Sequence, residues 1–89
     1  MKIITKYPLS FEPYQNISMT RNAMIIHVGV QKDLPYLWAL VDPYEPPYIC
    51  RFRMFQTGEE LDEKDTHTNY RGTLVFDDGE RHLNEYVRV

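Results

Sequence analysis

The chain has 89 residues, of which 43% are hydrophobic and 13% aromatic, and its formal net charge is −3. This length corresponds to one domain over residues 1–89, and the hydrophobic content is too high for a disordered chain. A net acidic chain is unusual among nucleic-acid-binding proteins, so direct binding of DNA or RNA is not expected. The only cysteine, Cys50, excludes an intramolecular disulfide. No apolar run reaches the ~18–20 residues of a membrane span, and no membrane association is expected.

Alternation of apolar and polar residues predicts strands along the first third of the chain. In residues 2–9, the positions expected to share a face are Ile3, Thr5, Tyr7 and Leu9. A short strand is expected at 17–20 and a longer one at 24–31. The longer strand is predicted to place Met24, Ile26, Val28 and Val30 on one face, and Ile25, His27, Gly29 and Gln31 on the other. Within it, Gly29 indicates a bulge or the close approach of another backbone.

The stretch 33–47, DLPYLWALVDPYEPP, is the most apolar part of the chain and has prolines near both ends. Only seven residues separate Pro35 from Pro43, and each proline biases the residue before it toward extended geometry. We therefore predict a strand over 36–41 that pairs with 24–31 as a hairpin across Lys32-Asp33. Because both faces of this strand are apolar, we expect it to be central and covered on both sides, with Trp38 in the core.

Further strands are predicted at 48–55, 70–76 and 81–89. The first places Tyr48, Cys50, Phe52 and Met54 on one face, and Ile49, Arg51, Arg53 and Phe55 on the other. The last places Leu83, Val87 and Val89 on one face, and His82, Asn84, Tyr86 and Arg88 on the other. Asp78-Gly79 indicates a hairpin turn between the last two strands. Thr57 followed by Glu60 matches a capping box, which would begin one or two helical turns.

Taken together, these elements predict an all-β fold, or a β fold with one short helix. The short turns between six to seven strands favour a small antiparallel sandwich or an open barrel.

Residues able to catalyse a reaction or bind a metal are sparse. His27, His67, His82 and Cys50 have no metal-binding spacing among them, so neither zinc nor another cofactor is expected. Cys50 and His82 would form a nucleophilic pair only if the fold brought them together. Because Cys50 lies on an apolar strand face, we expect it to act as a small hydrophobe instead. No phosphate-binding loop is present, and we do not expect an enzyme.

Three groups of residues are candidates for binding. The acidic stretch is either a solvated segment or a surface that docks on a basic groove of a partner, and it contains Glu59, Glu60, Asp62, Glu63 and Asp65. The alternative to a core position for Trp38 is an aromatic patch for a ligand or partner, formed by Tyr36, Trp38, Tyr44 and Tyr48. Its expected exposed members are Tyr44 and Tyr48, in a loop stiffened by prolines, where rigid tyrosines serve as interface anchors. Arg51 and Arg53 share a strand face, which is either a surface of mixed charge or a site for anions.

The order of five short motifs resembles a family of small proteins of unknown function that tailed phages and prophages encode. In this sequence the motifs are Lys6 to Leu9, Leu37 to Pro43, Thr57-Gly58, Gly72-Thr73 and His82. They extend over nearly the whole chain, and the Leu-Trp-Ala-Leu-Val-Asp segment is the most specific. The chain departs from the family pattern at Gln56, where glycine is more frequent, and in the proline-rich loop 43–47.

This resemblance implies a phage origin and the cytoplasm of a host cell, and it carries over no catalytic residues. We therefore expect a non-enzymatic protein that binds a host protein, as an inhibitor of an antiviral defence system such as a CRISPR nuclease complex. Two alternatives remain open. The first is a protein that sequesters a nucleotide or signalling molecule, using Arg51, Arg53 and an aromatic platform at the interface of a homodimer. The second is an accessory virion protein.

Overall fold

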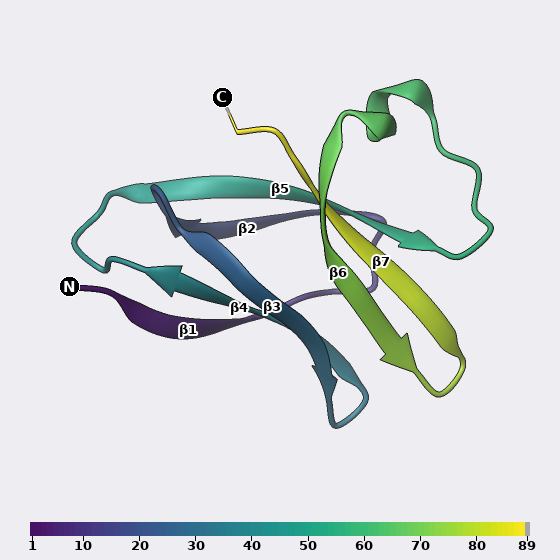
Figure 1. Ribbon diagram of the computed structural model, residues 1–89, viewed down its shortest axis with the longest axis horizontal. Helices are drawn as coiled ribbons and strands as arrows, with labels where there is room; N and C mark the ends of the chain where they lie inside the picture. The colour runs from purple at the N-terminus through teal and green to yellow at the C-terminus, as the bar shows by residue number, and fades with distance from the viewer. Residues whose placement is uncertain (89) are drawn as a thin grey trace.

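Seven strands in two antiparallel sheets make up the computed structural model, which describes residues 1–88 (Figure 1). The strands are β1 (Ile3–Pro8), β2 (Tyr14–Thr20), β3 (Met24–Gln31), β4 (Leu34–Val41), β5 (Pro47–Gln56), β6 (Thr68–Phe76) and β7 (Gly79–Tyr86). Between β5 and β6, the described chain forms one turn of 3₁₀ helix, η1 (Glu63–Thr66). The sheets have the orders β1-β4-β3 and β2-β5-β7-β6. The predicted all-β class and antiparallel sandwich are confirmed.

The core lies between the two sheets and is filled by every second residue of the central strands. Leu37 on β4, Phe52 on β5 and Leu83 on β7 are at most 1% exposed. Full burial of a side chain of this size stabilises the fold by about 1.5–3 kcal/mol. The faces predicted for 2–9, 36–41 and 48–55 are the faces observed, with Leu9, Leu37 and Phe52 directed to the core. On the other face of β5, Arg53 and Phe55 are buried as well.

The β3–β4 hairpin forms across the predicted turn. Gln31 pairs with Leu34, and the two residues between them have positive φ angles, 50° for Lys32 and 62° for Asp33. Two successive positive φ angles define a type I′ turn, whose twist matches that of the flanking strands. The tight turn fixes the register that places Leu37, opposite Val28, in the core.

A bulge in β3 changes which residues face the core. The register between β3 and β4 shifts between Ile25 and His27. As a result, Ile25 packs against the core, whereas Met24 and Ile26 are 59% and 47% exposed. The prediction that Met24 and Ile26 share a face with Val28 is therefore wrong, because the extra residue reverses the alternation on one side of the bulge.

The outer face of β4 is not covered by another layer of the described chain. Strand β4 is central in its sheet, as predicted, but Tyr36, Trp38 and Leu40 are only half-buried and lie outside the core cluster. The four-stranded sheet packs on the opposite face, against Leu37 and its neighbours. The prediction that Trp38 lies in the core is therefore wrong.

Strands β3 and β6 lie side by side where the two sheets meet (Figure 1). A Cβ atom on Gly72 would overlap Cγ2 of Val28, so only glycine permits this approach. The register of β6 against β7 shifts between Tyr70 and Gly72, which leaves Arg71 at a bulge. Gly72 thus allows one strand of each sheet to close the side of the sandwich.

The segment between β5 and β6 does not begin a helix at Thr57, so that prediction is wrong. The side chain of Glu59, rather than that of Glu60, accepts a hydrogen bond from a backbone N–H, at Gln56 (3.1 Å). This contact closes a turn, and the 3₁₀ turn η1 follows only at Glu63. In the final strand, Leu83 faces inward and His82 outward as predicted. Val87 is exposed beyond the strand, and Val89 lies outside the described residues.

Candidate functional site

The outer face of the three-stranded sheet carries an exposed aromatic and apolar surface, here called the aromatic face. Strand pairing places its members opposite one another on the same side of the sheet: Ile4, Lys6, Met24, His27, Tyr36, Trp38 and Leu40. Ile4 is 62% exposed at its edge, and Trp38 is half-buried at its centre. Contiguous apolar surface of this kind on a small domain is typical of a binding site.

The rings of the aromatic face are held by contacts with one another. Trp38 lies between His27 and Tyr36, with ring centroids 5.3 Å and 6.2 Å away. Lys6 Nζ lies 4.6 Å above the Tyr36 ring and donates a hydrogen bond to Gln31 (3.0 Å). Because these contacts restrict the side chains before any partner binds, little conformational entropy would be lost on binding.

Gly29 forms the floor beneath two of these rings. A Cβ atom at this position would lie 3.0 Å from Nε2 of His27 and 3.4 Å from Cζ3 of Trp38. The rings therefore rest over bare backbone. The sequence predicted a bulge or a neighbouring backbone at Gly29, whereas the bulge is at Ile26 and the close atoms belong to side chains.

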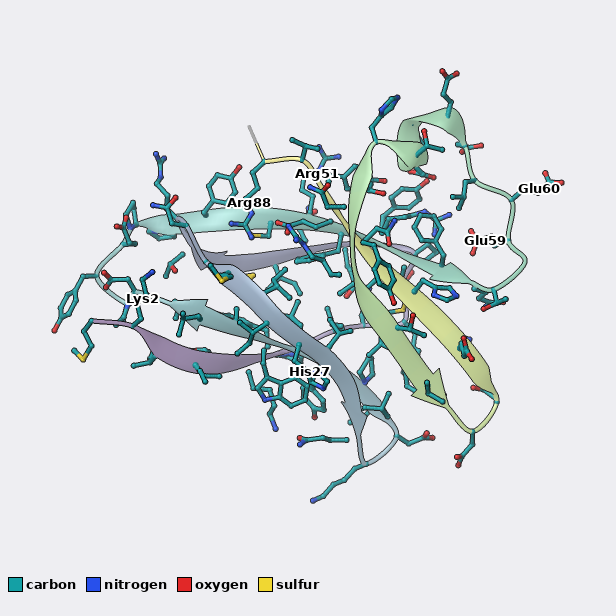
Figure 2. The ribbon with its side chains drawn as sticks, in the orientation of Figure 1. Lys2, His27, Arg51, Glu59, Glu60 and Arg88 are labelled. Carbon is teal, nitrogen blue, oxygen red and sulfur yellow. The ribbon has the colours of Figure 1, made fainter. Side chains whose placement is uncertain are left out.

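The predicted acidic surface is divided by the fold. Glu60, Asp62 and Glu63 are exposed, whereas Asp65 is only 1% exposed. Glu59 Oε2 accepts a hydrogen bond from Arg53 Nη2 (2.6 Å). Figure 2 places Glu59 and Glu60 at the opposite end of the molecule from Lys2. Three of the five acids therefore remain available to a partner without breaking contacts inside the protein.

Asp65 belongs to a buried network that fastens η1 to the outer face of the four-stranded sheet. It accepts hydrogen bonds from Tyr86 (2.6 Å), Tyr14 (3.1 Å) and Arg53 (3.4 Å). The hydrogen bond from Tyr86, with those from Tyr14 and Arg53, lowers the pKa of Asp65 against the opposing effect of burial. Burial and the bond to Asp65 in turn raise the pKa of Tyr86 to about 12.

The predicted arginine pair is also divided. Arg51 is exposed and lies 5.1 Å from the ring of Tyr86, measured from Cζ to the centroid. Arg53 is 6% exposed and is held by Glu59 and Asp65. An anion approaching Arg53 would have to displace two carboxylates, so these two arginines do not make a joint anion site in this structure.

The two tyrosines of the proline-rich loop have different surroundings. Tyr44 is 80% exposed, at a turn where its N–H donates to Asp42 Oδ1 (3.0 Å). Tyr48 is half-buried and packs against the core. Tyr44 is therefore the member of this pair that the fold presents to solvent.

Cys50 and His82 lie on opposite faces of the four-stranded sheet. Cys50 is 1% exposed and faces the core, where burial raises the pKa of its thiol. The His82 ring contacts Thr57 (2.8 Å) and Thr73 (3.1 Å) on the outer face. This arrangement excludes a Cys50–His82 pair. Among residues 1–88, no group of three or more His, Cys, Asp or Glu residues has the geometry to hold a metal ion.

Glu85 is a buried carboxylate that sequence analysis missed. It is 0% exposed and accepts hydrogen bonds from Arg71 Nε (3.0 Å) and Arg88 Nε (2.7 Å). The alternation of β7 could have indicated its burial, because Glu85 lies between Leu83 and Val87 on the strand face predicted to be apolar.

A model of the family described as "Domain of unknown function (DUF7352)" matches residues 1–88. No curated protein and no solved structure matches the chain. Within the described residues, no helix has the length and apolar character needed to cross a membrane.

Proposed function

Since this chain belongs to the DUF7352 family of domains of unknown function, we propose a function from its own surface: it is a non-enzymatic domain that binds another protein through the aromatic face. The observation that carries this proposal is Trp38, which is half-buried on the outer face and held between His27 and Tyr36 at its centre. Central, rigid tryptophan and tyrosine residues contribute most of the binding energy in many protein interfaces.

The charges around the aromatic face define the chemistry of the partner. Lys6 is exposed on the face, whereas the adjoining hairpin turn carries Lys32 and Asp33, whose opposite charges offset each other. In a protein with a net charge of −3, the positive charge of Lys6 on this face contrasts with the average surface. The matching partner has an apolar hollow for Trp38 and an acidic residue beside it that meets Lys6.

A narrower proposal names the partner. The resemblance of the sequence motifs to small phage and prophage proteins supports a phage origin and action in the host cytoplasm. A host antiviral defence effector, such as a CRISPR nuclease complex, is then the partner to test first. This step rests on the kinds of accessory proteins that phages carry, whereas the aromatic face supports protein binding on its own.

Binding experiments with purified effectors and the W38A variant test both the aromatic face as the binding surface and a defence effector as the partner. We expect the wild type to form a complex in gel filtration and to lower effector activity, and W38A to bind at least thirtyfold more weakly, as for an interface residue worth about 2 kcal/mol. Y44A is the matched control, because it truncates an exposed aromatic residue outside the face. Circular dichroism confirms that each variant is folded.

Two outcomes would overturn parts of the proposal. If E60K, on the acidic segment, abolishes binding while W38A retains it, the contact surface is not the aromatic face. If none of the tested effectors forms a complex with the protein, the narrower proposal is contradicted. Affinity capture from infected cells then tests the broader one, which requires a protein bound by the wild type and Y44A and lost from W38A.

A further inference from the structure

A cleft at the end of the sandwich is lined by two arginines that share a buried carboxylate. It has a volume of about 400 Å³, within the ~300–1,000 Å³ range of small-molecule sites. The residues that line it are Asn22, Ala23, Met24, Ile25, Asn69, Arg71, Tyr86 and Arg88. They come from the β2–β3 turn, β3, β6 and the end of β7, segments that are distant in sequence.

Glu85 lies beneath the cleft and fixes both guanidinium groups. Arg71 approaches it with Nε and Nη2, at 3.0 Å and 2.9 Å from Oε1. Arg88 binds Oε2 with Nε (2.7 Å) and donates from Nη1 to the carbonyl of Ala23 (2.7 Å). The bulge at Arg71 interrupts its pairing with β7, and bulges commonly redirect a side chain in this way.

The cleft carries more positive charge than its own fold requires. Two arginines on one carboxylate leave an excess of one positive charge. Arg88 also lines two smaller hollows, one together with Arg51 and the other together with Arg21. No Asp or Glu side chain lines any of the three hollows. In a protein with a net charge of −3, this concentration of arginine is a local feature that attracts anions.

The donors that remain at the surface suit a phosphate group. Within residues 1–88, Arg71 Nη1 has no hydrogen-bond partner, and about a third of the Arg71 side chain is exposed. Arginine recognises phosphate through paired N–H donors, and a side chain already fixed by Glu85 loses little entropy when it binds. Ile25 and Met24 form the apolar part of the wall, and Tyr86 lines the cleft beside them.

We propose that this cleft binds a phosphorylated small molecule that carries a flat organic group, with its phosphate at Arg71 Nη1 beside the positive charge of Arg88, and its flat group against Ile25 and Tyr86. The site is independent of protein binding at the aromatic face, although Met24 stands at the border of both. It also differs from the anion site that the sequence predicted at Arg51 and Arg53.

Calorimetric titration with ADP, inorganic pyrophosphate and adenosine tests the proposal. We expect ADP to bind most tightly, pyrophosphate more weakly, and adenosine too weakly to detect. Binding should weaken as salt is raised from 50 to 300 mM, because it depends on charge. Binding of pyrophosphate without any gain from ADP would overturn the contact with the flat group. No binding of either phosphate at millimolar concentration would overturn the whole proposal.

The R71Q variant locates the site. We expect it to weaken ADP binding at least tenfold, whereas R81Q, at a half-buried arginine on β7 outside the three hollows, retains the wild-type affinity. Amide chemical shifts then show whether ADP perturbs Asn22, Asn69 and Tyr86. Unchanged binding by a folded R71Q protein, or perturbation confined to other strands, would overturn the assignment.

Discussion

Arg53 and Asp65 form an ion pair, with 3.4 Å between Nε and Oδ2, that joins β5 to the turn η1. Both side chains are at most 7% exposed, although the segment that contains Asp65 is the most polar part of the chain. The pair fastens this segment over the outer face of the four-stranded sheet and leaves Glu60, Asp62 and Glu63 at the surface. The segment is therefore part of the packed structure and not a free acidic loop.

Replacing Arg53 should destabilise the protein strongly. The R53M variant keeps most of the buried apolar contact but leaves Asp65 with only tyrosine donors. Removing one partner of a buried ion pair typically costs about 3–5 kcal/mol, and we expect a loss of that size in urea unfolding. R51M is the matched control, since Arg51 is exposed on the same strand, and it should cost less than about 1 kcal/mol. Equal effects of the two substitutions would contradict the role given to the pair.

Acid should weaken the same network. Hydrogen bonds, chiefly from Tyr86 to Asp65 and from the Gln56 N–H to Glu59, lower the pKa of both carboxyls in the folded protein. Their folded pKa values then lie below the unfolded values of about 3.9 and 4.3. The stability they contribute is fully present above the unfolded values and is lost as pH falls through the folded ones.

Urea unfolding at pH 6, 4.5 and 3 measures this loss. The wild-type midpoint should fall between pH 4.5 and pH 3. D65N has no carboxyl to protonate at this position, so it should start lower and fall less. A wild type and a D65N variant with parallel pH profiles would show that Asp65 does not contribute to the acid sensitivity.

Gly72 should tolerate no side chain while Val28 is present. A methyl group at position 72 overlaps Cγ2 of Val28, and overpacking of this kind costs about 1–3 kcal/mol. We expect G72A to lower the free energy of unfolding by that amount. Because V28A removes the overlapping atom, G72A should cost less in a V28A background. Strict additivity of the two substitutions in a double-mutant cycle would contradict this explanation.

Sequence periodicity predicted the sandwich because alternating residues mark the strands over 2–9, 24–31 and 48–55, and short turns join successive strands. It failed at Trp38, whose face is also apolar, because alternation does not reveal whether a second layer covers that face. It failed at Ile26, where one extra residue reverses the alternation. Because of these errors, the sequence directed attention to the proline-rich loop and the acidic segment, whereas the structure identifies the aromatic face as the candidate site.

The buried charges were harder to predict for a different reason. Asp65 is buried because Tyr14, Arg53 and Tyr86 reach it from three strands, and Tyr14 lies 51 residues away in sequence. No local pattern distinguishes it from the exposed acids beside it. Glu85 could have been found, since it occupies an inward position of β7 with Arg88 three residues later, but its other partner, Arg71, lies at a bulge that the sequence does not signal.

The type I′ turn of the β3–β4 hairpin offers a substitution that should stabilise the protein. Asp33 has a φ angle of 62°, a conformation that costs residues with a side chain about 1 kcal/mol and that glycine adopts freely. Glycine is also the preferred second residue of this turn. Because glycine gives the unfolded chain more freedom, a large part of the gain is offset, and we expect D33G to raise the free energy of unfolding by at most about 0.5 kcal/mol. D78G is the matched control: Asp78 lies in the β6–β7 turn and does not have a positive φ angle, so it should gain nothing. Urea unfolding of both variants measures the difference, and equal stabilisation by D33G and D78G would show that backbone strain at Asp33 is not its source.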